Sequence, residues 1–128
     1  MIGRLRCLVI DCPDAGELAE FYRRLVGGEV VSPDPRWAVG EGSAVLRGDG
    51  GQALVFQGVA DHRPPVWGAP EQQFHLDVWV DDLDAAHEAV LALGAVPLGD
   101  GGLDAGGGDP AWRVYADPAG HPFRLVRL

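Results

Sequence analysis

The sequence predicts an α+β fold in which two βαβββ modules pair to form an eight-stranded, half-open barrel with a central cleft. Three observations lead to this prediction. The chain has 128 residues, which is enough for one domain of ordinary size but not for two full ones. Its 19 glycines and 10 prolines favour many short elements joined by turns over a bundle of long helices. The pattern of residues 7–25 also returns in residues 75–93, at an offset of 68.

Each copy of this repeat predicts a strand followed by a helix. An apolar strand leads into an aspartate suited to cap a helix, about three helical turns follow, and a glycine ends them. The capping aspartates are Asp14 and Asp82, and the terminating glycines are Gly27 and Gly94. Apolar side chains recur at helical spacing in both copies, so each helix has one apolar stripe that can cover a sheet.

Short strands are expected after each helix. They are placed at residues 29–32, 37–39 or 44–47, and 52–59 in the first half, and at residues 95–98, 111–116 and 122–128 in the second. Turns at residues 49–51 and 117–120 occupy matching places. The proline-rich stretch 61–72 is interpreted as a linker, and the glycine-rich stretch 99–108 as a loop beside the cleft. One domain over residues 1–128 then has module one at about 4–60 and module two at about 73–128.

Strand alternation indicates which residues face the cleft. A βαβββ module covers one face of its sheet with a helix and leaves the other face bare, so two modules are needed to enclose an apolar interior. In the first strand of the second module Leu76, Val78 and Val80 are the apolar set that belongs under the helix. His75, Asp77 and Trp79 therefore face the cleft, whereas the inward face of the strand at residues 111–116 stays open.

Charge and composition exclude several kinds of partner. The balance of 10 basic and 19 acidic residues gives a net charge of -9, which repels nucleic acid and anionic membrane surfaces. No apolar run reaches the length of a signal peptide or a membrane span, so a cytoplasmic protein is expected. Cys7 and Cys12 lie five residues apart in a strand and point to opposite faces, so no bridge between them is expected.

The paired modules resemble the vicinal oxygen chelate superfamily, and within it the small bacterial glyoxalase-like and bleomycin-resistance-protein-like members. The similarity lies in the opening IDCPDAGELAEFYRRLVGG, the segment HLDVWVDDLDAA and the ending DPAGHPFRLV, and it covers essentially the whole chain. It implies the glyoxalase/bleomycin resistance/dioxygenase fold. Function does not follow from it, because the superfamily includes isomerases, epimerases, dioxygenases, thiol transferases and non-catalytic drug-binding proteins.

The resemblance also implies four positions for metal ligands, one on the first strand and one on the last strand of each module. These positions fall at Cys7, at Val55 or Gln57, at His75 and at Arg124. His75 matches the family pattern, but a guanidinium has no lone pair to offer a metal. Since catalytic metal sites need about three protein ligands, the site is expected to be incomplete and a divalent metal is disfavoured.

Two functions are compatible with these residues. The first is a small-molecule-binding protein without the usual complete metal site. The second is a glyoxalase-type lyase or isomerase, or a related enzyme, acting on a small carbonyl, hydroxyacid or thiol-derived substrate, with His75 and Asp77 as catalytic residues. The acidic surface favours a cationic ligand, whereas an inward Arg124 favours a carboxylate or phosphate. The expected ligand-binding residues are Cys7, Gln57, His75, Asp77, Trp79 and Arg124.

A second copy of the chain is the expected protein partner. Both modules carry edge strands punctuated by glycine and proline, which can pair across a two-fold axis. The family resemblance also implies a homodimer, in some members with whole modules exchanged between the chains. Whether the modules are swapped here is left open.

Overall fold

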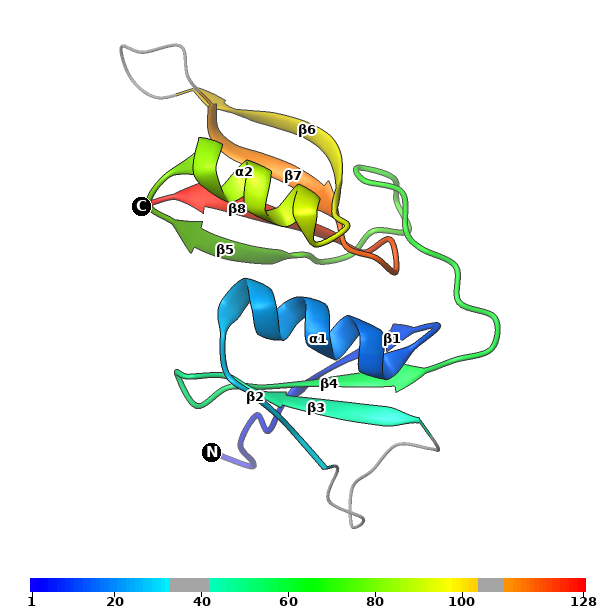
Figure 1. Ribbon diagram of the computed structural model, residues 1–128. Coiled ribbons are helices and arrows are strands. Elements are labelled where there is room, and N and C mark those ends of the chain that lie inside the picture. Colours follow the sequence, from blue (N-terminus) through cyan, green and yellow to red (C-terminus); the bar gives the residue numbers. More distant parts are fainter. Residues whose placement is uncertain (33–41, 104–109) are drawn as a thin grey trace. The chain divides into compact units, whose positions relative to one another are not determined.

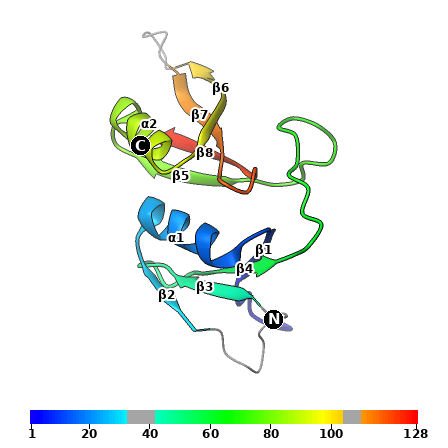
Figure 2. The same ribbon diagram turned by 45° about the vertical axis from the view of Figure 1, so that its right-hand side comes forward.

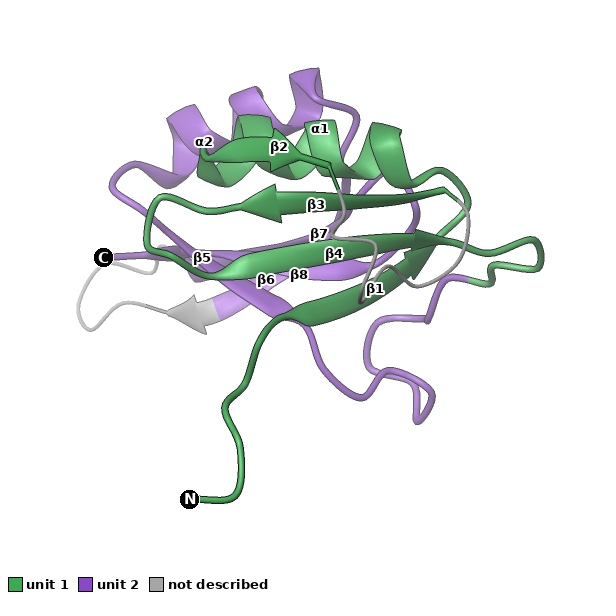
Figure 3. Cartoon of the chain, turned by 90° about the horizontal axis from the view of Figure 1, so that it is seen from below, with its two compact units in different colours: residues 1–63 green, residues 64–128 purple. Residues whose placement is uncertain are grey.

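The computed structural model describes residues 1–32, 42–103 and 110–128 (Figure 1). The chain divides into two compact units, residues 1–63 and 64–128 (Figure 3). Each unit is one βαβββ module, so the predicted α+β class and the two predicted modules are confirmed. The division falls inside the proline-rich stretch 61–72, most of which belongs to the second unit.

Unit 1 is a four-stranded sheet with one helix across it (Figure 1 and Figure 2). Its elements are β1 (Leu8–Cys12), α1 (Ala15–Val26), β2 (Glu29–Val31), β3 (Ser43–Arg47) and β4 (Ala53–Gly58). The strand order is β1-β4-β3-β2, with β1 parallel to β4 and the other neighbours antiparallel. The helix begins at Asp14, whose carboxylate accepts a hydrogen bond from the Glu17 amide at 3.0 Å, and its Tyr22 ring stacks on Phe56 of β4 at 5.5 Å. This apolar contact fixes which face of the sheet α1 covers.

Unit 2 repeats the arrangement. Its elements are β5 (Leu76–Val80), α2 (Leu83–Ala92), β6 (Val96–Leu103), β7 (Pro110–Ala116) and β8 (Pro122–Arg127). The strand order is β5-β8-β7-β6, with β5 parallel to β8. Asp82 caps α2 by accepting hydrogen bonds from two backbone amides in its first turn. No helix in the described ranges is long and apolar enough to cross a membrane.

The structure confirms the internal repeat. The strands β1 and β5 and the caps Asp14 and Asp82 keep the offset of 68. The final strands are displaced by one residue more, because Leu8 is the Cα partner of Leu54 whereas Leu76 is the partner of Phe123. At this offset of 69, the residue of unit 1 that corresponds to Arg124 is Val55.

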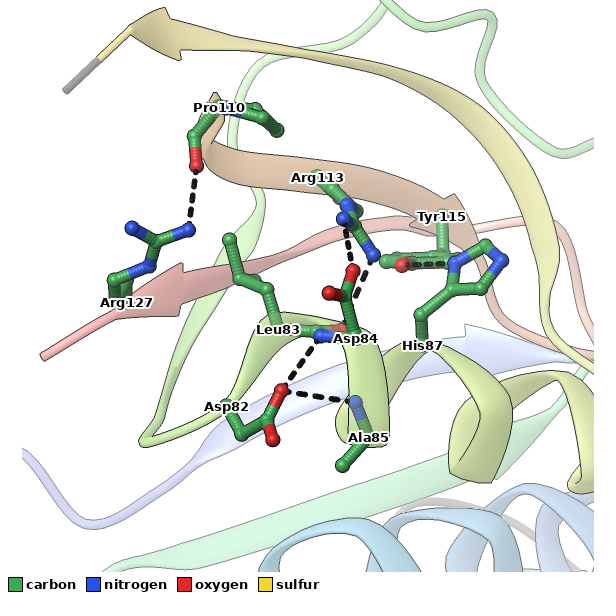
Figure 4. Close-up of polar contacts among 9 residues, drawn as sticks. All are labelled: Asp82, Leu83, Asp84, Ala85, His87, Pro110, Arg113, Tyr115 and Arg127. Atoms are coloured by element: carbon green, nitrogen blue, oxygen red, sulfur yellow. Dashed lines mark hydrogen bonds and ion pairs between the residues drawn. The ribbon is translucent and has the colours of Figure 1, made fainter. Parts of the chain in front are cut away.

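Polar contacts hold α2 on its sheet (Figure 4). The Arg113 guanidinium donates to the Leu83 carbonyl at 3.2 Å and to the Asp84 carboxylate at 2.7 Å. The Tyr115 hydroxyl lies 2.7 Å from Nδ1 of His87. Arg113 and Tyr115 therefore face α2, and alternation places the other side chains of β7 on the opposite face of the sheet. The face of this strand, which the sequence left open, follows from these contacts.

One predicted segment differs from the structure. The glycine-rich stretch 99–108 was expected to be a loop, but its first part continues β6 as far as Leu103, paired with β7. The glycines form a strand here because the backbone of β7 pairs with them. The pairing register shifts between Pro97 and Gly99, which is an irregularity of the kind that glycine in a strand often marks. Residues 104–108 and the alternative strand at 37–39 lie outside the described residues, whereas the alternative at 44–47 is confirmed by β3.

Candidate ligand site

The face of the unit 2 sheet opposite α2 carries four of the predicted site residues. The strand register aligns Asp77, Arg124 and Val114 in one row across β5, β8 and β7. It aligns Trp79, Val126 and Trp112 in the next row. We call this surface the open face. Its first row carries opposite charges, and its second row is apolar.

Asp77 and Arg124 form a bidentate ion pair in the charged row. The Arg124 Nε donates to Asp77 Oδ1 at 2.7 Å, and Nη2 donates to Oδ2 at 2.6 Å. The hydrogen bonds from Arg124 lower the pKa of Asp77 below its ordinary value, and the contact with His75 acts in the same direction. The same pairing raises the pKa of Arg124. Both groups are therefore charged at neutral pH, and the guanidinium is held in one orientation.

Trp112 supports the other side of this guanidinium. The Arg124 Cζ lies 5.0 Å from the centroid of the Trp112 ring, within the range of a cation–π contact. The ring itself lies over Gly101 of β6, where an added Cβ would come within 2.7 Å of Trp112 Cζ2. A glycine at this position thus gives the indole room to lie flat beside Arg124.

His75 lies immediately before β5 and contacts Asp77. Its Nε2 lies 3.2 Å from Asp77 Oδ1, and its Nδ1 lies 3.4 Å from the side-chain nitrogen of Gln72. The side-chain oxygen of Gln72 accepts a hydrogen bond from the backbone amide of Gly68 at 3.2 Å. This contact turns the side-chain nitrogen of Gln72 towards His75. Because that nitrogen only donates, Nδ1 is the acceptor and Nε2 carries the proton donated to Asp77.

Trp67 completes the surroundings of His75. Its ring meets the imidazole edge-to-face with centroids 5.2 Å apart. Trp67 and Gln72 both come from the connecting segment that sequence reasoning treated as a linker. No periodic pattern marks them, and their closeness to the start of β5 was the only available signal.

Trp79 is the most exposed site residue on the open face. It is 74% exposed, although indole is one of the most apolar surfaces a protein carries. The side chains of His75, Asp77 and Arg124 are 26%, 43% and 24% exposed. The open face thus combines a fixed, partly exposed polar cluster with an unburied aromatic ring.

The other two predicted site residues lie in unit 1. Cys7 is half-buried and precedes β1, and Gln57 of β4 is half-buried with Asp11 as its Cα partner. Phe56 faces α1, so its neighbour Gln57 points to the face of the unit 1 sheet away from the helix.

The residues of unit 2 do not fit a divalent metal. His75 and Asp77 are the candidate donors, but Asp77 already accepts two hydrogen bonds from Arg124, whose fixed positive charge repels a second cation. Val55, the residue of unit 1 that corresponds to Arg124, is 1% exposed, and its side chain has no atom that can bind a metal. No group of three or more His, Cys, Asp or Glu side chains with metal-binding geometry occurs among residues 1–32, 42–103 and 110–128.

Comparison with known proteins defines the family. The model of a glyoxalase-like domain matches residues 7–126, so the chain belongs to the glyoxalase-like family, as the resemblance to the vicinal oxygen chelate superfamily implied. No curated protein matches the chain significantly.

Solved structures share the fold at low sequence identity. The fosfomycin resistance protein FosX from Listeria monocytogenes, complexed with Mn(II) and a sulfate ion, matches with a TM-score of 0.71 and 15% identity, over 99% of this chain and 91% of that one. A glyoxalase/bleomycin resistance protein/dioxygenase family enzyme from Burkholderia phytofirmans matches with a TM-score of 0.65 and 18% identity, over 98% of both chains. An integron cassette protein from V. cholerae matches with a TM-score of 0.58 and 21% identity, over 99% and 96%. These similarities establish the fold. They do not identify a ligand, which has to be inferred from the residues of the site.

Proposed function

We propose that this chain is a small-molecule-binding protein that holds an organic ligand on the open face of unit 2, without a divalent metal at the family's ligand positions. The observation that carries the proposal is the oriented Arg124 guanidinium, fixed by Asp77 and Trp112 beside the exposed Trp79. Small-molecule sites generally combine apolar surface with a few fixed polar groups, and this face offers both.

Orientation before binding is the reason this cluster favours a ligand. Arginine has large rotamer entropy, and a free arginine would lose it on binding. Here Asp77 and Trp112 already restrict the side chain, so a ligand gains the hydrogen bonds of Arg124 at smaller entropic cost.

Catalysis by His75 and Asp77 is the alternative, and the 3.2 Å contact between them favours it. A general base, however, needs an available lone pair. The Nδ1 lone pair of His75 accepts from Gln72, while Nε2–H donates to Asp77. Asp77 in turn is held ionised by Arg124, so it is a poor proton donor at neutral pH. These contacts support binding over a glyoxalase-type reaction.

A thermal-shift screen of small acids, thiol conjugates and aromatic cations tests the proposal. Compounds that raise the melting temperature are then titrated by tryptophan fluorescence against the wild type, Arg124→Gln and Trp79→Ala. The proposal expects weaker binding to both variants. A ligand that binds both variants with unchanged affinity would contradict it.

Metal removal provides a separate test. Since Arg124 occupies one of the four positions at which the family resemblance implies a metal ligand, the purified protein should contain well under one equivalent of divalent transition metal, and a chelator should leave its melting temperature unchanged. The result that overturns this expectation is a near-stoichiometric metal content that disappears in His75→Ala.

Self-association is part of the same proposal. The edge strand β6 exposes Val96 and Leu98, which are 57% and 43% exposed, and an apolar edge strand can pair with a second chain. We therefore expect a homodimer, and light scattering that returned a monomer mass at micromolar concentration would contradict it. The unbridged Cys7 and Cys12 thiols fit a reducing compartment such as the cytoplasm.

A further inference from the structure

We infer that the ligand of the open face is a small aryl carboxylate, bound through its carboxylate to the outer edge of Arg124 with its ring on the apolar row. This inference rests on the proposed function and adds the chemical class of the ligand.

Unused hydrogen-bonding capacity favours an anion. Of the five guanidinium N–H groups, Asp77 engages one on Nε and one on Nη2. Three remain, two on Nη1 and one on Nη2, and within the described part of the chain no hydrogen bond reaches Nη1. The Asp77 carboxylate already accepts from Arg124 twice and from His75 once, so little acceptor capacity is left for a cationic ligand. The Arg124–Asp77 pair therefore has more unused hydrogen-bond donors than acceptors, which favours a ligand that accepts hydrogen bonds.

The geometry of these donors selects a planar oxyanion. Asp77 occupies the edge formed by Nε and Nη2, which leaves the edge formed by Nη1 and Nη2. Two parallel N–H groups on one guanidinium edge match the two oxygens of a carboxylate. Trp112 covers one face of the guanidinium, which reduces competition from water for these donors.

The neighbouring row selects an apolar body on the same molecule. Trp79 and Val126 stand two residues along their strands from Asp77 and Arg124, which is roughly 6.6 Å in a β-strand. A ring joined to a carboxylate by one or two carbon atoms spans this separation. Trp79 is 74% exposed, so covering it with an aromatic ring removes apolar surface from water.

Titration with matched probes tests the inference. The acids are phenylacetate and 3-phenylpropionate, the cation of similar shape is 2-phenylethylammonium, the neutral analogue is 3-phenylpropionamide, and acetate provides a carboxylate without a ring. Binding is followed by tryptophan fluorescence and by backbone amide shifts in NMR spectra. We expect the two aryl acids to bind at least tenfold more tightly than the other three probes, because only they satisfy both rows.

Variants in the charged row and in the apolar row test whether the preference for aryl acids depends on these residues. Arg124→Gln should weaken the aryl acids about 10- to 100-fold, the usual effect of losing hydrogen bonds to a charged group. Trp79→Ala should weaken them several-fold without making the cation the preferred probe. Arg23→Gln is the matched control, because Arg23 lies in an exposed ion pair with Glu20 on α1 of unit 1, and it should leave affinity unchanged.

Three outcomes would overturn the inference, and they also separate it from the proposed function. Binding of the cation or the amide in preference to the acids, with loss in Trp79→Ala, would refute the carboxylate class and leave small-molecule binding on the open face intact. Binding of the acids that neither Arg124→Gln nor Trp79→Ala weakens would refute both. Absence of binding by all five probes at millimolar concentration would refute the inference, while the wider thermal-shift screen still decides the proposed function.

Discussion

The turn between β7 and β8 is predicted to depend on one buried carboxylate. Asp117 is 3% exposed, and its Oδ1 accepts hydrogen bonds from the Ala119 amide at 2.8 Å and the His121 amide at 3.0 Å. Nδ1 of His121 lies 2.9 Å from Oδ2. Gly120 completes the turn at a φ of 93°, a conformation that favours glycine. The turn leads into β8, so it also determines the position of Arg124.

Replacing Asp117 with Ala removes all of these acceptor contacts. A hydrogen bond to a charged group contributes about 1.5 to 3 kcal/mol, but such contributions are not additive, and water can reach the half-buried amides that lose their partner. We therefore expect a loss of about 2 to 4 kcal/mol in the free energy of unfolding. For a chain of this length the melting temperature should fall by roughly 8 to 15 °C.

Two further variants make the measurement specific. Asp117→Asn keeps one oxygen for the two backbone amides and replaces the oxygen that faces the His121 ring, so it should cost about 1 kcal/mol. Asp61→Ala removes an exposed carboxylate and should change stability by less than about 0.5 kcal/mol. Denaturant unfolding followed by circular dichroism gives all three values. If Asp117→Ala melts within about 2 °C of the wild type, this account of the turn is wrong.

Three other variants test the surroundings of the site. Asp77 contributes stability while it is ionised, so the contribution is present above its ordinary pKa and is lost as pH falls through the lowered folded pKa. Asp77→Asn should therefore cost at most about 1 kcal/mol at pH 7, because the carboxylate is 43% exposed, and the difference from wild type should shrink below roughly pH 4 in urea titrations. Gly101→Ala should push the Trp112 ring away from Arg124 and shift the indole N–H signal of Trp112 in NMR spectra, and an unchanged signal would contradict the contact. Arg113→Gln should speed amide exchange in α2 more than in α1, and equal exchange rates would show that the arginine does not hold α2.

Local rules account for the elements that the sequence determined. Asp14 and Asp82 cap helices because a carboxylate satisfies amide groups that the first turn leaves without partners, and this depends only on neighbours in the chain. Alternation likewise separated Leu76, Val78 and Val80 from Asp77 and Trp79, since successive side chains of a strand point to opposite faces. The repeat then allowed one module to be checked against the other.

The contacts of the site required the tertiary structure. Asp77 and Arg124 are 47 residues apart, and only the parallel register of β5 and β8 makes them partners. The register of the last strands also selects Val55 over Gln57 as the counterpart of Arg124, a choice that the uncertain alignment of the hairpin had left undecided. The sequence thus determined the modules, their caps and the two faces of β5, because these follow from periodicity along the chain. Which side chains meet on the open face, including Trp67 and Gln72 from an irregular segment, was decided by strand pairing and packing, because such contacts join residues that no local pattern links.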